Sequence, residues 1–413
     1  MFTYLLDNKM YPKHKTNLSI NFCGVKFANP FILAAAPPTD DIEMVKDAFR
    51  AGWAGAILKT TSVEGTKVDL AYPMISGIDF ENNRLMGMGN IDLISEHHID
   101  VIEQRILQLK KEFPNNRVIA SISGSDKTSW QEVARRTCKA GADLIECSFS
   151  CPQGTLGLKP GAMLGQDPVA SASVTSWIKE VAGPIPIIIK LTPQVNDIAE
   201  IAMAVKCAGA DAVCVGNTIP SLMGIDLESG VPFPNVGGKS TYSGLSGSAV
   251  KPVSLRCIAI VKKATDLAIA GSGGAISWKD AYEFMLVGAG LVEFCTAVMH
   301  YGVDIIEDLV EGFAFHLNKK GIINVSDIIG KSLEFIVSHE ELPRKDWRPY
   351  IITDDCVRCG MCMVACKDGG HRAISMSEDR LPKIDDEKCV GCALCSSVCH
   401  VKCIEMQERN KHE

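Results

Sequence analysis

The sequence lacks a surplus of basic residues, long apolar runs and an apolar leader. Its 413 residues include 42 lysines and arginines against 49 aspartates and glutamates, which gives a net charge of −7. Such a chain has no electrostatic footprint for the phosphate backbone of DNA or RNA, so we expect no nucleic-acid partner. No apolar run approaches the roughly 20 residues that span a bilayer, and residues 1–16 lack the core and cleavage site of a signal peptide. We therefore expect a cytoplasmic protein without a membrane span.

The polar bias of disordered chains is missing as well. Hydrophobic residues make up 46% of the sequence and charged residues 22%, which is ordinary for a globular protein. The length exceeds that of one typical domain, and we expect one large domain and one small one.

Cysteine, by contrast, is abundant. Of 17 cysteines, nine fall between Cys356 and Cys403 at short regular intervals, and eight are scattered between Cys23 and Cys295. A secreted disulfide scaffold would be short and would carry a signal peptide. The cysteines therefore indicate metal or redox chemistry.

The region from residue 30 to about 320 alternates short apolar runs with helix-length segments, a pattern typical of parallel β/α units. The predicted helices include Asp40–Ala51, Ser129–Ala140, Gln194–Ala208 and Trp278–Val287. The predicted strands are Phe31–Ala36, Gly55–Thr60, Arg117–Ser123, Asp143–Ser150, Pro186–Thr192, Asp211–Thr218, Leu267–Gly274 and Leu291–Ala297.

A repeated helix end supports this interpretation. Glycine follows a predicted helix and precedes a strand at Gly52, Gly141, Gly209 and Gly288, where the left-handed conformation is tolerated. Eight such units predict an α/β fold of the (β/α)8 (TIM) barrel type, with an open doubly wound sheet as the alternative. The longest loops, residues 61–93, 151–166 and 219–247, leave C-terminal strand ends, where barrel enzymes place their chemistry. Residues 18–29 are predicted to form a hairpin before the barrel.

The last sixty residues contain the spacing C-x2-C-x2-C-x3-C twice. This is the arrangement of two-cluster ferredoxins, in which the fourth cysteine of each run binds the other cluster. Two zinc knuckles are the alternative. The proline that usually follows the fourth cysteine is absent from both runs. Cys403 lies outside the two runs, and we expect it to have a structural role. We assign one [4Fe-4S] cluster to Cys356, Cys359, Cys362 and Cys399, and the second to Cys389, Cys392, Cys395 and Cys366.

A cluster domain attached to a barrel predicts a redox cofactor inside the barrel. The run Gly271–Gly274 ends the seventh strand and Cys295–Ala297 ends the eighth, where barrel loops present backbone N–H groups to a phosphate; a simple turn is the alternative. The expected domains are an N-terminal segment (1–30), the barrel (31–320), a linker (321–352) and the two-cluster ferredoxin-like domain (353–413).

Residues 145–153, which read IECSFSCPQ, resemble the active-site segment of the FMN-binding barrels of the dihydropyrimidine and dihydroorotate dehydrogenase superfamily. The resemblance covers nearly the whole chain, and the fused ferredoxin tail is similar to that of bacterial NAD-dependent dihydropyrimidine dehydrogenases. Further matching segments are Asn29-Pro30-Phe31, Leu58-Lys59-Thr60, Asn90-Ile91, Lys190-Leu191-Thr192-Pro193, Asn217-Thr218 and Ser243–Gly247.

The resemblance implies FMN-dependent reduction of the C5–C6 double bond of uracil or thymine, with Cys151 as the proton donor to C5. A thiol suits this role because its ordinary pKa, near 8.5, keeps it mostly protonated at neutral pH; an inert buried cysteine is the alternative. The implied substrate-binding residues are Asn90, Ser148, Ser150, Asn217 and Thr218. The implied cofactor-binding residues are Ala35, Lys59, Thr60, Asn90, Lys190, Asn217, Ser246, Gly247, Gly273, Gly274, Cys295 and Thr296.

Two features qualify the expected activity. Ser148 stands where the family usually has asparagine, so one expected substrate contact differs, and dihydroorotate or another conjugated ring remains an alternative substrate. No G-x-G-x-x-G lies between a strand and a helix, so NAD(P)H and FAD are expected only in a separate electron-input subunit. A non-catalytic electron-transfer subunit without FMN is the remaining alternative.

Overall fold

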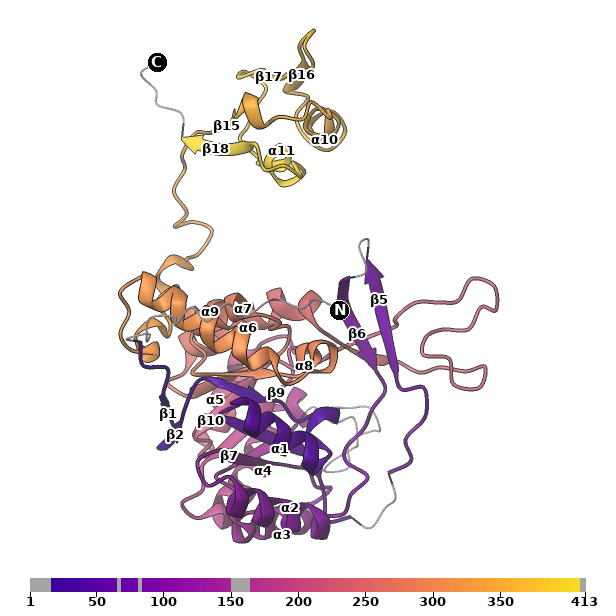
Figure 1. Cartoon of the computed structure of the whole chain (residues 1–413), viewed down its shortest axis with the longest axis vertical. Helices are drawn as coiled ribbons and strands as arrows, with labels where there is room; N and C mark the ends of the chain where they lie inside the picture. The colour runs from indigo at the N-terminus through magenta and orange to yellow at the C-terminus, as the bar shows by residue number, and fades with distance from the viewer. Residues whose placement is uncertain (1–15, 65–67, 81–83, 150–163, 409–413) are drawn as a thin grey trace, which may run out of the picture. The chain divides into compact units, whose positions relative to one another are not determined.

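The computed structural model describes residues 16–64, 68–80, 84–149 and 164–408. It divides the chain into two compact units, Met1–Phe335 and Ile336–Glu413. The first unit contains a closed barrel of eight parallel strands, as predicted, and the open doubly wound sheet is wrong (Figure 1). Neighbours around the barrel are β3 (Phe31–Leu33), β4 (Gly55–Thr61), β7 (Arg117–Ile122), β8 (Leu144–Ser148), β9 (Ile187–Leu191), β10 (Ala212–Val215), β13 (Ala268–Gly271) and β14 (Leu291–Phe294), which closes on β3.

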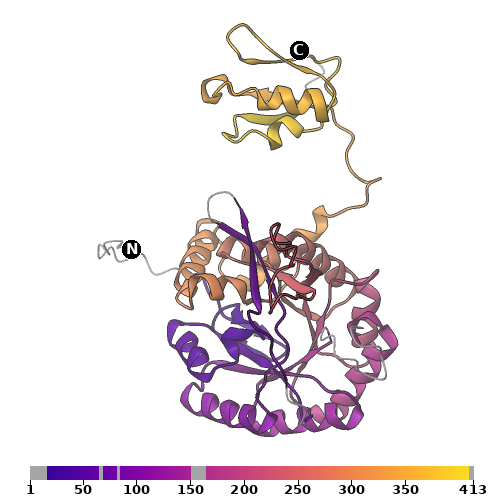
Figure 2. The ribbon, with the colours of Figure 1, turned by 90° about the vertical axis from the view of Figure 1, so that its right-hand side faces the viewer.

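Helices form a ring around these strands (Figure 2). Among the described residues, none of the helices combines the length and hydropathy needed to cross a bilayer. The helices of this unit are α1 (Ile42–Ala51), α2 (Ile99–Glu112), α3 (Lys127–Ala140), α4 (Pro168–Ala182), α5 (Ile198–Cys207), α6 (Lys251–Ala264), α7 (Trp278–Leu286), α8 (Thr296–Tyr301) and α9 (Ile305–Lys319). Short 3₁₀ turns lie at Pro37–Thr39, Leu164–Gln166, Ser248–Val250, Val325–Ile328 and Leu333–Phe335.

The barrel strands are mostly apolar because both of their faces are covered. Every residue of β4 and β9 is buried, as expected for a parallel sheet enclosed by helices. The helices end where the sequence predicts: Gly52 and Gly141 adopt φ values of 118° and 96° and cap α1 and α3. These glycine caps end the helices, and the chain then returns to the next parallel strand. The C-terminal ends of the eight parallel strands therefore lie on one face of the barrel.

Two long loops contain strands that the sequence did not reveal. The segment after β4 forms β5 (Ile75–Phe80) and β6 (Arg84–Asn90), and the segment after β10 forms β11 (Ile219–Ser221) and β12 (Ser243–Ser246). They join in one antiparallel sheet in the order β11-β12-β6-β5. The hairpin of β5 and β6 stands out from the barrel in Figure 1. The predicted hairpin before the barrel is confirmed as β1 (Ile20–Phe22) and β2 (Val25–Phe27).

The second unit is small and rich in cysteine. Two antiparallel pairs frame it: β15 (Trp347–Ile351) with β18 (Ile404–Glu408), and β16 (Ile374–Met376) with β17 (Pro382–Ile384). A turn at Thr353–Asp355 and the helices α10 (Met361–Gly369) and α11 (Leu394–Ser397) complete it. Its small buried core includes Cys362 and Cys366 of the first run and Cys395 of the second, whereas Cys359 and Cys392 are exposed.

Candidate active site

A cavity of about 230 Å³ opens at the C-terminal ends of the barrel strands. Residues at the ends of, or just after, β3, β4, β8, β9, β10, β13 and β14 all reach it. Ser150 and Cys151 lie outside the described residues. The other predicted substrate and cofactor residues line this one cavity: Ala35, Lys59, Thr60, Asn90, Ser148, Lys190, Asn217, Thr218, Ser246, Gly247, Gly273, Gly274, Cys295 and Thr296.

Lys190 lies in β9 between two fully buried glutamates. Its Nζ is 3.4 Å from Oε1 of Glu146 in β8 and 3.0 Å from Oε2 of Glu293 in β14. Burial by itself would lower the pKa of Lys190, but the acidic groups Cys214, Glu146 and Glu293 raise it well above its usual value. The ammonium therefore stays charged at the floor of the cavity.

The two carboxyl groups cannot both be ionised at low cost. Burial raises the pKa of Glu146 to about 8, and neighbouring Glu293 adds to this while Lys190 opposes it. Glu146 Oε2 and Glu293 Oε1 have no hydrogen-bond partner among the described residues. One lysine, one carboxylate and one carboxylic acid make a neutral set, which is the cheapest composition for a buried site.

The side chains around Glu146 and Glu293 fit the Lys190 ammonium better than a metal ion. Ligand atoms of Glu146, Cys214 and Glu293 lie within 4.8 Å of one another. The Lys190 ammonium, however, already contacts both carboxyl groups, and a second cation there would face its charge at close range. Sequence reasoning gave neither glutamate a role, although a glutamate inside an apolar strand such as LVEF was a detectable signal.

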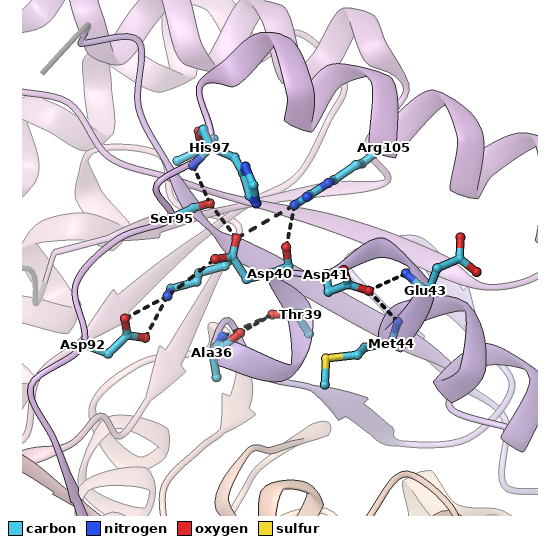
Figure 3. Close-up of polar contacts among 12 residues, drawn as sticks. Ala36, Thr39, Asp40, Asp41, Glu43, Met44, Asp92, Ser95, His97 and Arg105 are labelled. Carbon is cyan, nitrogen blue, oxygen red and sulfur yellow. Dashed lines mark hydrogen bonds and ion pairs between the residues drawn. The ribbon is translucent and has the colours of Figure 1, made fainter. Parts of the chain in front are cut away.

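Lys59 is the second cation of the cavity, and it is also paired. Its Nζ lies 2.8 Å from Asp92 Oδ2 and 3.6 Å from Asp40 Oδ2. Figure 3 shows this network, in which Ser95 Oγ donates to Asp40 Oδ1 at 2.5 Å and Arg105 Nη1 donates to the Asp40 carbonyl at 2.6 Å. Asp92 lines the cavity and was missed from sequence, because nothing local indicates that it meets a lysine 33 residues away.

Three glycines form a cradle at one side of the cavity. Gly247, Gly273 and Gly274 adopt φ values of 89°, 92° and 100°, which residues with a Cβ resist. A Cβ on Gly274 would lie 2.5 Å from the backbone nitrogen of Lys251, at the first turn of α6. A backbone this close to a helix N-terminus suits an anionic group such as a phosphate. The cradle, the buried ammonium and the amide side chains therefore fit FMN.

The hydroxyl and amide groups around the cavity are ordered by their own contacts. Thr296 Oγ1 lies 2.9 Å from Ser246 Oγ, which in turn donates to the Met88 carbonyl at 3.0 Å. The Thr218 backbone N–H donates to Asn217 Oδ1 at 2.7 Å. These hydrogen bonds hold the polar side chains in fixed positions around the cavity. Recognition of a flat polar ring needs a few polar groups placed in this way.

The second unit gathers the cysteines of its two runs around two separate cavities. One is lined by Cys389, Cys392, Cys395 and Cys366, and the other by Cys356, Cys359, Cys362 and Cys399, together with Cys403. The fourth cysteine of each run thus lies with the three cysteines of the other run. This is the exchange that the spacing predicts, and it supports the assignment of the ligands.

Comparisons with known proteins agree with both units. Residues 17–317 match the dihydroorotate dehydrogenase family, and residues 350–406 match a 4Fe-4S dicluster domain. Subunit PreA of the NAD-dependent dihydropyrimidine dehydrogenase of Escherichia coli (strain K12) is 39% identical over 95% of this chain and 96% of its own length. The chloroplastic dihydropyrimidine dehydrogenase (NADP(+)) of Arabidopsis thaliana is 32% identical over 80% of both chains.

Two further likenesses cover about three quarters of this chain. The catalytic subunit of the dihydroorotate dehydrogenase B (NAD(+)) of Methanosarcina acetivorans is 34% identical over 76% of this chain and 96% of its own. The crystal structure of the dihydroorotate dehydrogenase of Eimeria tenella with ferulenol superposes with a TM-score of 0.63, covering 78% of this chain and 89% of the other, at 21% identity. That second likeness shows the fold alone.

Proposed function

Because this chain belongs to the dihydroorotate dehydrogenase family and continues into a 4Fe-4S dicluster domain, we propose that it reduces the C5–C6 double bond of a pyrimidine such as uracil or thymine. FMN is the cofactor of the barrel, and two [4Fe-4S] clusters are the cofactors of the second unit. The observation that carries the proposal is that each of the cations among the described lining residues of the barrel cavity, Lys59 and Lys190, is paired with acidic side chains, in a chain that also holds eight cluster cysteines.

The cavity suits a neutral ring better than a carboxylate. Among the described residues that line it, the cations are Lys59 and Lys190, and each contacts two acidic side chains. Orotate carries a carboxylate, which would need an unpaired positive charge to offset its desolvation. Uracil and thymine present only imide N–H and C=O groups, which amides match with one donor and one acceptor each.

In this proposal each residue has a distinct task. Asn90, Asn217 and Thr218 hydrogen-bond the imide edge, and Ser148 supplies a shorter hydroxyl contact where the family usually has an amide. Bound FMN supplies the hydride that is added at C6. Cys151 gives its thiol proton to C5, a step for which general acids contribute roughly 10²- to 10⁴-fold. Lys190 keeps a positive charge at the cavity floor, where it stabilises negative charge that develops during the reaction.

Electrons are proposed to enter through the clusters from a separate FAD- and NAD-binding subunit in the cytoplasm. The relative from Escherichia coli is itself described as a subunit, and this sequence has no G-x-G-x-x-G between a strand and a helix. The purified chain alone should therefore not oxidise NADH at a catalytically useful rate. NADH oxidation at such a rate without a partner would contradict this part of the proposal.

A substrate panel tests the activity. The chain with its cofactors is mixed anaerobically with dihydrouracil, dihydrothymine, dihydroorotate and the saturated counterparts of an unrelated enone series, and the flavin absorbance is followed. We expect bleaching by the two dihydropyrimidines without a carboxylate. Bleaching by dihydroorotate alone would favour the dihydroorotate dehydrogenase alternative, and a preparation with clusters but no releasable FMN would favour the non-catalytic one.

Asp92 offers a sharper test of the charge argument. The Asp92→Asn variant removes the carboxylate nearest to the Lys59 ammonium and leaves Asp40 at 3.6 Å. We expect dihydroorotate to bind at least about tenfold more tightly than to the native protein, a gain of about 1.4 kcal/mol. Asp266→Asn, which breaks an exposed pair with Lys206, is the control. Equal affinities for dihydroorotate in all three proteins would show that the pairing does not set specificity.

A further inference from the structure

The two cysteine-lined cavities of the second unit differ in one respect. Four cysteines line the cavity around Cys389, whereas the cavity around Cys356 has a fifth, Cys403. A [4Fe-4S] cluster takes four protein thiolates. The cavity around Cys356 therefore has one thiol more than its cluster needs as ligands.

The backbone fixes the position of this extra thiol. The Cys403 carbonyl accepts the Ile352 N–H at 2.9 Å, and the next residue, Ile404, begins β18 opposite Ile351 of β15. Lys402 adopts φ 58° and donates its N–H to the Cys399 carbonyl at 3.1 Å, which turns the chain back on itself. The strand pair and the turn together leave Cys403 only 3% exposed.

The turn brings the extra thiol beside two of the assigned ligands, Cys356 and Cys399. Cys403 Sγ lies 3.5 Å from Cys399 Sγ, within hydrogen-bond distance for sulfur. This separation is far longer than the roughly 2.05 Å of a disulfide, so the two sulfurs are in contact without being bonded. A ligating thiolate has no proton to donate, whereas a buried thiol keeps its proton because burial disfavours the charged form.

We propose that Cys403 donates an S–H···S hydrogen bond to the ligating Sγ of Cys399 and thereby raises the reduction potential of the cluster held by Cys356, Cys359, Cys362 and Cys399. Reduction adds one negative charge to the cluster, and a donor to a ligand sulfur stabilises the more negative state. At the cluster assigned to Cys389, Cys392, Cys395 and Cys366, the Cys366 Sγ accepts the backbone N–H of Ala373 at 3.3 Å. No fifth thiol lines that cavity among the described residues.

The test uses the full chain with both clusters in place. Cys403→Ala removes the donor, Cys403→Ser keeps a shorter one, and Cys207→Ala, an exposed cysteine in α5, is the control. Iron per chain is measured first, and an EPR-monitored redox titration then gives both midpoints. We expect full iron content in every variant. In Cys403→Ala, the midpoint reduction potential of one cluster should fall by up to about 59 mV, which is a tenfold change in the reduction equilibrium for one electron. In Cys403→Ser the fall should be smaller.

Each other outcome has a defined meaning. Unchanged midpoints in Cys403→Ala at full iron content would overturn the inference, as would equal shifts of both clusters. Loss of one cluster from both Cys403 variants would also overturn it, because Cys403 would then be a ligand rather than a donor. The inference rests on the cluster assignment in the proposed function, and native protein without two clusters of iron would refute that assignment instead.

Discussion

The glycine cradle gives the most direct prediction, because the structure allows its consequence to be worked out. A Cβ on Gly274 would lie 2.5 Å from the nitrogen and 2.7 Å from the Cα of Lys251, whereas ordinary contacts begin near 3.4 Å. The Gly274→Ala variant must therefore push the first turn of α6 away by roughly 1 Å. A hydrogen bond to a charged phosphate does not survive such a shift, and each is worth about 1.5–3 kcal/mol.

We expect Gly274→Ala to weaken FMN binding by about 10- to 150-fold, the equivalent of one such bond. Part of any effect comes from forcing alanine into a left-handed conformation, at about 1–2 kcal/mol. Gly141→Ala controls for this cost, since Gly141 has a φ of 96°, close to the 100° of Gly274, while its nearest Cβ contact would be an ordinary 3.9 Å. The assay is titration of the apoprotein with FMN, followed by flavin fluorescence, alongside thermal unfolding.

If both variants lose stability equally but Gly274→Ala binds FMN as tightly as native protein does, the cradle does not hold the phosphate and the reasoning is wrong. Equal loss of FMN affinity in both variants would point to backbone strain instead of the close approach to α6.

Three further predictions follow from the cavity and the clusters. Cys151→Ala should leave flavin reduction by NADH through the partner intact while pyrimidine reduction falls by about 10²- to 10⁴-fold; unchanged turnover would exclude Cys151 as the proton donor. Cys366→Ala should abolish the same EPR signal as Cys389→Ala, although the two residues lie in different runs; loss of different signals would mean that each run holds its own cluster. The raised pKa of Glu146 means that the folded barrel keeps a proton which the unfolded chain releases near pH 4.5, so the contribution of Glu146 to stability is full below that pH and declines as pH rises through about 8. Glu146→Gln should flatten this decline, which amounts to several kcal/mol, in urea unfolding of the apoprotein at pH 5 and pH 8; a slope equal to that of native protein would show that Glu146 is already ionised.

Local sequence patterns were sufficient to predict the features that depend on a single strand, helix or turn. The runs Ala56–Leu58 of β4 and Ile187–Ile189 of β9 are apolar, so their enclosure by helices could be inferred directly. Glycine at the end of α1 and α3 gave both helix termini. The cysteine spacing likewise gave the number of clusters and the exchange of Cys366 and Cys399, because each run places three sulfurs on one tight loop.

The extra antiparallel sheet shows where these rules fail. β6 contains Gly87 and Gly89, and β12 contains Gly244, residues that weaken any strand prediction. The structure explains the glycines: a Cβ on Gly89 would lie 2.2 Å from the Met223 side chain, and one on Gly244 would lie 2.5 Å from Thr218 Oγ1. Because these glycines have no side chain, they allow close contacts between segments that are distant in the sequence, which a local propensity does not record.

The sequence by itself thus determined the barrel, the cluster domain and which strand ends carry polar residues. Tertiary structure alone decided their charge relations: Asp92 contacts Lys59, and Glu146 and Glu293 both contact Lys190. The physical reason is barrel closure, which brings side chains of β8, β9 and β14 together inside the barrel although Glu293 lies 103 residues from Lys190. Periodicity fixes which side of a strand a residue occupies, but the partner across a barrel depends on the register of every strand between them.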